Sequence, residues 1–269
     1  MNILLLGDIV GPSGRKAITE KLPGIIKKKK IDFVVLNGEN AGDMGVGITR
    51  KNFDEFLKAG ADVVTTGNHV WDEKETMEFI TSEKRLLRPQ NLVEGSPGNG
   101  YGIFVSKNKK KVAVINLMGN VFMKKCNDIF EEAKKIIKVV QLKKNTDFIV
   151  VDIHGEITSE KMALGYFFDG KATLVVGTHT HVPTSDHMIL EKGTAYQTDV
   201  GMCGDYKSVI GMNRDNSLKK FLKDPSSQKH HPALGEATLS GTMVTADDST
   251  GLAIKVEQII IGKYLENRI

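Results

Sequence analysis

The sequence predicts an α/β protein of four layers, α/β/β/α, in which two β-sheets pack face to face and helices cover their outer sides. The first half of the chain alternates short apolar runs with helix-like segments, the pattern of a parallel sheet with crossover helices. The tail consists mainly of strand-like segments separated by turns, which is typical of antiparallel pairing. Because no linker, repeat or low-complexity stretch interrupts the 269 residues, a single domain over residues 1–269 is expected.

The first half of the chain justifies the parallel sheet element by element. Ile3–Leu6 is a continuous apolar run, as expected for a strand buried on both faces. A turn-rich loop follows, and Ser13 is the predicted N-cap of a helix that ends near Lys28. The alternation then continues with a strand at Phe33–Leu36, a helix at Thr49–Lys58, a strand at Val63–Thr65 and a helix at Glu73–Thr81.

The second half begins with two segments that we expect to pair as a hairpin, Tyr101–Ser106 and Lys111–Leu117, with Lys109-Lys110-Lys111 at the turn. The pattern then predicts a helix over Asp128–Lys144, a strand at Phe148–Ile153, a helix at Glu160–Tyr166 and a strand at Thr173–Val176. The tail adds strands at Met188–Leu190, Thr194–Thr198, Ala237–Val244 and Ala253–Ile261, with one helix at Asn213–Leu222.

Composition narrows the functional classes. With 40% hydrophobic and 26% charged residues, the chain is neither disordered nor fibrous. No apolar run reaches the roughly 20 residues of a membrane span, and the opening segment lacks the basic region of a signal peptide. The formal charge of +4 is too small to indicate nucleic-acid binding, and Lys27-Lys28-Lys29-Lys30 is interpreted as a solvated helix end. We therefore expect neither membrane association nor stable DNA binding.

The cysteine count points to a reducing compartment. The two cysteines, Cys126 and Cys203, lie far apart and form no disulfide framework or cysteine zinc motif. The expected location is the cytoplasm.

Metal-capable side chains follow several of the predicted strands. In an open α/β sheet, groups at the carboxyl ends of the strands meet in one crevice. The series comprises Asp8, Glu39, Asn40, Asn68, His69, His154, His179 and His181.

Each member of this series has a simpler interpretation. Asp8 could cap a helix, Asn40 and Asn68 could be ordinary turn residues, and His154 could be a hydrogen-bonded structural histidine. Glu39 is less easily explained, because glutamate is a poor turn residue. Their joint occurrence at corresponding strand ends favours a metal site.

Imidazole, carboxylate and amide groups together suit manganese, iron or zinc rather than calcium. Two metals held roughly 3.5–4 Å apart need a bridging group, and the Glu39 carboxylate can supply one. A bridging hydroxide between the metals would act as nucleophile. The reaction class that this set supports is hydrolysis at phosphorus.

Taken together, the motifs resemble the calcineurin-like metallophosphoesterase superfamily, and most closely its YmdB-like branch, which hydrolyses 2′,3′-cyclic nucleotides and other phosphodiesters. The resemblance extends over nearly the whole chain and implies the α/β/β/α metallophosphoesterase sandwich. The motifs, in order, are Gly7-Asp8-Ile9-Val10-Gly11, Asn37-Gly38-Glu39-Asn40-Ala41, Gly67-Asn68-His69-Val70-Trp71-Asp72, Arg88-Pro89, Thr158-Ser159-Glu160-Lys161, Ala163-Leu164-Gly165, Gly177-Thr178-His179-Thr180-His181-Val182, Thr198-Asp199-Val200-Gly201-Met202 and Leu239-Ser240-Gly241.

The resemblance implies two divalent or trivalent metal ions per chain, iron or manganese before zinc or magnesium. One metal would be bound by Asp8, Glu39, Asn40 and His181, and the second by Glu39, Asn68, His154 and His179. His69 would bind neither metal and would instead protonate the leaving oxygen as general acid. A hydrogen bond from His69 to a ligand is the simpler alternative for that residue. Asp72 is interpreted as the cap of the following helix, and orientation of His69 is its alternative role.

Two positions depart from the superfamily pattern. Val10 replaces the usual histidine of the first motif, and Glu39 replaces the usual bridging aspartate, as in the YmdB-like branch. Asn40 would supply the oxygen that compensates for the missing histidine.

The expected function is therefore a metal-dependent phosphodiesterase acting on 2′,3′-cyclic nucleotides or short RNA ends. Two alternatives stay open. One is a regulatory nucleotide- or RNA-binding protein with little turnover, and the other is a phosphomonoesterase on the same scaffold. A homo-oligomer is compatible with the sequence.

Overall fold

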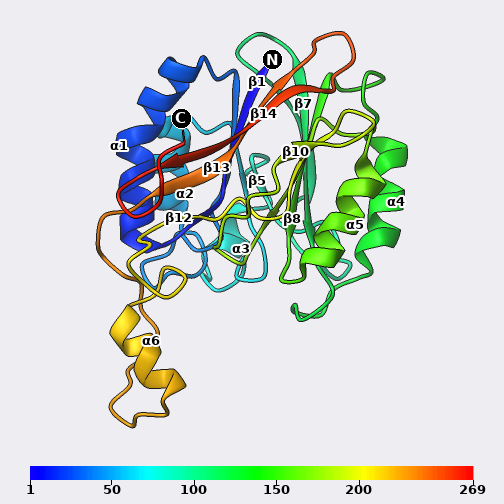
Figure 1. Cartoon of the computed structure of the whole chain (residues 1–269). Coiled ribbons are helices and arrows are strands. Elements are labelled where there is room, and N and C mark those ends of the chain that lie inside the picture. The colour runs from blue at the N-terminus through cyan, green and yellow to red at the C-terminus, as the bar shows by residue number, and fades with distance from the viewer. Residues whose placement is uncertain (269) are drawn as a thin grey trace.

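The strands of the computed structural model, which describes residues 1–268, form two large sheets and one small one (Figure 1). The first sheet has the order β14 (Ala253–Ile261), β13 (Leu239–Ala246), β1 (Asn2–Leu6), β3 (Phe33–Asn37), β4 (Val63–Thr65) and β5 (Leu86–Leu87). The second has the order β10 (Met188–Ile189), β11 (Ala195–Gln197), β9 (Leu174–Thr178), β8 (Phe148–His154), β7 (Lys111–Met118) and β6 (Tyr101–Val105). A short pair joins β2 (Asp8–Ile9) to β12 (Met202–Cys203). Residue 269, the last of the predicted domain, lies outside the described residues.

Helices cover the outer faces of the two sheets, which confirms the predicted four layers. In Figure 1, α1 and α2 lie on the outer side of the first sheet, and α4 and α5 lie on the outer side of the second. A sixth helix, α6, extends away from the body of the molecule. The helices are α1 (Gly11–Lys29), α2 (Arg50–Ala59), α3 (Thr76–Phe79), α4 (Ile129–Val139), α5 (Thr158–Phe168) and α6 (Arg214–Phe221).

Three apolar clusters occupy the three spaces between the layers. Strand β1 shows how the sequence builds them, because its apolar residues alternate between two clusters. Leu4 and Leu6 pack toward α1 and α2, whereas Ile3 and Leu5 pack between the sheets. The third cluster lies between the second sheet and helices α4 and α5. A strand buried on both faces is apolar at nearly every position, which is why the run Ile3–Leu6 indicates a strand.

The two sheets do not correspond to the two halves of the chain, although the sequence pattern changes from alternating strands and helices to mainly strands. Strands β13 and β14, at the end of the chain, join the first sheet because β13 pairs antiparallel with β1. The segments from β6 to β11 build the second sheet. The N-terminal parallel strands are therefore completed by the C-terminal hairpin, and both sheets are mixed.

Several predicted boundaries were wrong, each for a local reason. Helix α1 begins at Gly11 without a side-chain cap, and the Ser13 hydroxyl donates instead to the Ala233 carbonyl. The helix expected at Glu73–Thr81 is only the four-residue α3. The helix expected to reach Lys144 ends at Val139. The two-residue strands β2, β5 and β12 were too short to be predicted.

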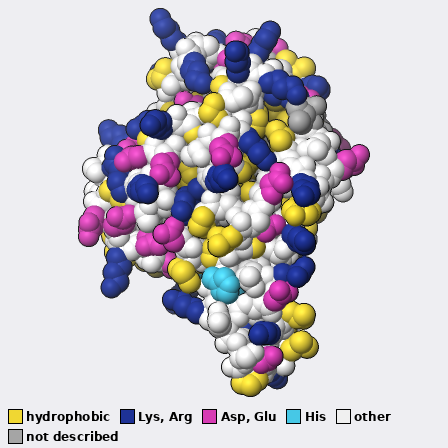
Figure 2. All heavy atoms as spheres, turned by 90° about the vertical axis from the view of Figure 1, so that its left-hand side faces the viewer, with side chains coloured by type: hydrophobic (Ala, Val, Ile, Leu, Met, Phe, Trp, Pro, Cys, Tyr) yellow, Lys and Arg dark blue, Asp and Glu magenta, His cyan; other side chains and the backbone are white. Residues whose placement is uncertain are grey.

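The first basic run ends a helix, as the sequence predicted, whereas Lys111 of the second run belongs to strand β7 and only Lys109 and Lys110 lie in the turn before it. Lys27–Lys29 end α1, and Lys30 follows in the left-handed conformation with φ 51°. Figure 2 shows lysine, arginine and acidic side chains interspersed over the face that α1 helps to form. No helix among the described residues has the length and apolar character needed to cross a bilayer.

Candidate metal centre

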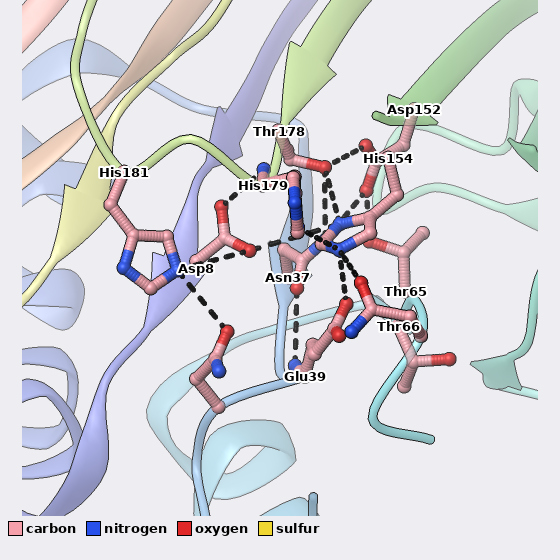
Figure 3. Close-up of polar contacts among 12 residues, drawn as sticks. Asp8, Asn37, Glu39, Thr65, Thr66, Asp152, His154, Thr178, His179 and His181 are labelled. Carbon is pink, nitrogen blue, oxygen red and sulfur yellow. Dashed lines mark hydrogen bonds and ion pairs between the residues drawn. The ribbon is translucent and has the colours of Figure 1, made fainter. Parts of the chain in front are cut away.

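The side chains singled out in the sequence come from both sheets and meet at one edge (Figure 3). Asp8 follows β1 of the first sheet and is the first residue of β2, and residues 39–40 and 68–69 follow β3 and β4 of the first sheet. The second sheet contributes His154 at the end of β8, with His179 and His181 just after β9. Because β1, β3, β4, β8 and β9 all end at this edge, the residues after them converge across the boundary between the sheets.

The first group of contacts surrounds the Nε2 atom of His154. The Glu39 Oε2 atom lies 2.6 Å from it, the Asn68 Oδ1 atom 3.2 Å and the His179 Nδ1 atom 3.1 Å. The Glu39 oxygen lies in a geometry that makes no hydrogen bond. Four potential ligand atoms, one from each of these residues, thus lie close together.

A short relay behind His154 determines which ring nitrogen holds the proton. The Thr178 hydroxyl donates to Asp152 Oδ1 at 2.8 Å, so it accepts from His154 Nδ1 at 3.0 Å. His154 Nε2 therefore presents a lone pair toward Glu39. This arrangement of lone pairs is repulsive unless a cation lies among them.

The second group of contacts surrounds His181. Its Nδ1 atom donates to the Ile210 carbonyl at 2.7 Å, since a carbonyl only accepts. The Nε2 lone pair then faces Asn40 Oδ1 at 3.3 Å and Asp8 Oδ1 at 3.8 Å. The Asp8 Oδ1 atom is buried without a hydrogen-bond partner. The other Asp8 oxygen accepts from the backbone N–H of His179 at 3.1 Å.

These donors fit a metal ion. Asp8, Glu39 and His154 each offer a ligand atom, and the three atoms lie within 4.8 Å of one another. Two unsatisfied buried carboxylate oxygens are costly unless something positive binds them. The structure therefore contains a potential metal-binding group at this edge.

Burial sets the protonation of the site. Removal from water raises the pKa of Glu39 to about 7 and also raises the pKa of Asp8. The same effect lowers the pKa of His154 to about 4 and that of His179 to about 3. Both imidazoles are thus neutral near pH 7 and able to bind a cation through a lone pair.

His69 lies beside the ligand cluster rather than within it. Its backbone N–H donates to Glu39 Oε1 at 2.7 Å, and its ring Nδ1 atom lies 2.6 Å from Asp72 Oδ2. About a third of the His69 side chain is exposed. The interpretation of Asp72 as a helix cap was wrong, because α3 begins at Thr76 and Asp72 contacts His69 instead.

Sequence reasoning missed or undervalued several residues that support the site. Asp152 is fully buried, and burial raises its pKa to about 7 although it accepts hydrogen bonds from Thr65, Asn37 and Thr178. A carboxylate inside the apolar run of β8 was the available signal. No motif in the sequence singled out Lys124. Its Nζ atom nevertheless donates to the Asn68 carbonyl at 2.6 Å and lies 3.6 Å from Asp72.

Comparisons with known proteins match nearly the whole chain. A family model described as "YmdB-like protein" matches residues 4–259. A Bacillus subtilis (strain 168) protein named 2′,3′-cyclic-nucleotide 2′-phosphodiesterase is 46% identical over 261 residues, which is 97% of each chain.

Two solved structures superpose over almost their full length. One, described as a novel phosphatase from Mycoplasma pneumoniae, has a TM-score of 0.88 and 36% identity, and the match covers 97% of this chain and 93% of that one. The other, a hypothetical protein from Thermus thermophilus, has a TM-score of 0.89 and 35% identity, with 98% and 100% covered.

Proposed function

The chain belongs to the YmdB-like protein family, and from this premise we propose that it is a metal-dependent phosphodiesterase that hydrolyses 2′,3′-cyclic nucleotides or short RNA ends. The observation that supports the proposal most directly is the pair of unsatisfied buried oxygens, on Asp8 and Glu39, facing histidine lone pairs. A site built in this way needs cations, and cations are suited to binding a phosphodiester anion.

Two metal ions per chain fit the donor set. Asp8, Glu39, Asn40 and His181 would hold one, and Glu39, Asn68, His154 and His179 would hold the other. When bound, the ions would supply Lewis acidity, which neutralises phosphate charge and activates water. The many oxygen donors favour iron or manganese over zinc.

The chain's own side chains would position the reacting groups. Glu39 is fixed by the backbone N–H of His69, which keeps its carboxylate turned toward both clusters. His69 would donate a proton from Nε2 to the leaving oxygen, and Asp72 fixes the ring through Nδ1. Lys124 adds positive charge beside the position where His69 would act.

The same proposal includes the cellular location, the domain organisation and the partner of the enzyme. The two free cysteines suit a reducing cytoplasm, where we propose that the enzyme works as a single domain. Its partner would be a small phosphodiester or an RNA end.

A turnover assay tests this function. Purified protein loaded with Mn²⁺ is expected to hydrolyse many equivalents of 2′,3′-cyclic AMP and of bis-p-nitrophenyl phosphate. A stoichiometric burst that then stops would favour the regulatory binding protein. Faster hydrolysis of p-nitrophenyl phosphate than of either diester would favour the phosphomonoesterase. Elemental analysis of the protein as purified identifies the native metal.

Metal binding is expected to release protons. Burial raises the pKa of Glu39 to about 7 and raises the pKa of Asp8, so the metal-free chain keeps protons that a cation must displace. His154 and His179, with pKa values of about 4 and 3, are already neutral and release none at pH 7. The apparent affinity for Mn²⁺ should therefore rise as pH increases from about 5 to 8.

Calorimetric titration at pH 6.5 in two buffers of different ionisation enthalpy measures the released protons. Different heats are expected in the two buffers. Equal heats, with an affinity that does not change with pH, would contradict a site built on protonated carboxyls.

A further inference from the structure

The turn after β9 has a strained backbone. His179 has a φ of 96° and His181 a φ of 67°, both in the left-handed region that residues with side chains seldom adopt. Such a conformation persists only where the surrounding structure fixes it. Since both histidines are proposed metal ligands, whatever fixes this turn also fixes two ligands.

A buried ion pair lies directly beneath this turn. The Lys161 side chain, from α5, is only 1% exposed, and its Nζ atom lies 2.8 Å from Asp199 Oδ2. The same ammonium group donates to the Thr178 carbonyl at 2.8 Å. Asp199 Oδ2 in turn accepts from the backbone N–H of Thr180 at 3.1 Å. The pair thus binds the backbone on both sides of His179.

The backbone at Gly177 passes so close to the Lys161 side chain and the Thr198 carbonyl that only glycine fits there. A Cβ atom added at Gly177 would lie 2.5 Å from Lys161 Cδ and 1.8 Å from the Thr198 carbonyl oxygen. Asp199 is fixed as well, because its Oδ1 atom accepts from the Gly201 N–H at 2.8 Å. A buried ion pair is weak evidence for stability, since desolvation of both charges opposes their attraction. Its contacts with the turn suggest a different purpose.

We propose that Lys161 and Asp199 form a positioning pair that holds His179 and His181 in the orientation in which they bind the metals. This rests on the metal ligands of the proposed function. The pair touches neither metal nor substrate, and it acts only through the backbone of residues 178 and 180. Without it, the strained turn relaxes and the two imidazoles leave their positions.

The Lys161→Met variant tests the proposal, because methionine keeps much of the side-chain length without the charge. We expect its affinity for Mn²⁺ to fall about 10–100-fold, the loss usual when the groups that orient metal ligands are removed. The kcat should fall with it, and KM measured at saturating Mn²⁺ should change little. Lys171→Met is the matched control, because Lys171 is an exposed lysine just beyond α5 whose ammonium group contacts Phe167, away from the turn.

A double variant, Lys161→Met with Asp199→Asn, separates positioning from stability. It removes the unpaired buried charge, so its Tm should recover relative to Lys161→Met. Its Mn²⁺ affinity should stay low, because the Thr178 carbonyl still lacks its donor. Affinity that recovers together with Tm would show a merely structural pair and overturn the proposal. If Lys161→Met does not fold, the double variant alone decides the question through its affinity.

Failure of this inference can be distinguished from failure of the proposed function. Wild-type protein that binds no Mn²⁺ would refute the metal assignment itself. Wild-type protein and Lys161→Met that bind Mn²⁺ equally tightly would refute only the positioning pair.

Discussion

Replacing His69 with alanine is expected to lower kcat about 10²–10⁴-fold while the metal content stays at the wild-type level. This is the usual contribution of a positioned general acid or base. The substitution removes the imidazole beside Asp72 but keeps the backbone N–H that donates to Glu39. The ligand set is therefore left in place, and only the proton donor is lost.

The His69→Ala experiment combines steady-state kinetics on 2′,3′-cyclic AMP with elemental analysis. Asp72→Asn is the graded control, since it keeps the imidazole and removes the carboxylate that fixes the ring. Its loss of kcat should be smaller. Turnover of His69→Ala at the wild-type rate would refute the acid role. Loss of metal in that variant would indicate that the His69 imidazole helps to hold the ligand set and does not act on the substrate alone.

The second large effect is expected for Glu39→Gln, which should lose metal and with it turnover. Glu39 is the one carboxylate proposed to contact both ions, and glutamine keeps its size without its charge. Removing even a group that orients a ligand typically weakens metal binding about 10–100-fold, and loss of the bridging carboxylate should exceed this. Full occupancy by two metals in the variant would refute the bridging role.

The same substitution should stabilise the metal-free chain at high pH. Burial raises the pKa of Glu39 from 4.5 to about 7, so the folded state favours the protonated form and wild-type stability falls as pH rises through this range. A shift of this size corresponds to roughly 3 kcal/mol at pH 8.5. Because glutamine cannot ionise, the free energy of unfolding of the variant does not fall in this way as pH rises.

Urea unfolding in the presence of EDTA at several pH values measures the effect. The free energy of unfolding of Glu39→Gln, relative to wild type, should increase between pH 5 and pH 8.5. A constant difference across this range would mean that the Glu39 carboxylate is not destabilised by burial. A residue that improves binding at the expense of stability is typical of functional sites.

Local patterns located the short buried strands because burial on both faces favours apolar residues along the whole strand. Phe33–Leu36 is apolar throughout, and Phe148–Ile153 is apolar except for Asp152. The helix expected at Glu73–Thr81 is shorter because residues 73–75 form turns, with the Thr76 N–H bonded to the Glu73 carbonyl, and the chain is helical only over Thr76–Phe79. The segment just before it is held by a contact distant in sequence, the bond from the His69 N–H to Glu39.

By itself, the sequence determined which residues follow the ends of the buried strands, and the family motifs predicted that these residues form a metal site. Only the tertiary structure decided that Glu39 of the first sheet lies 2.6 Å from His154 of the second, and that Lys161 lies beneath the turn of His179 and His181. The physical reason is the separation of these residues in the sequence. Apolar periodicity reports which side of a single helix or strand is buried. The contacts named here depend on how two sheets and a helix pack together, which no local pattern in the sequence predicts.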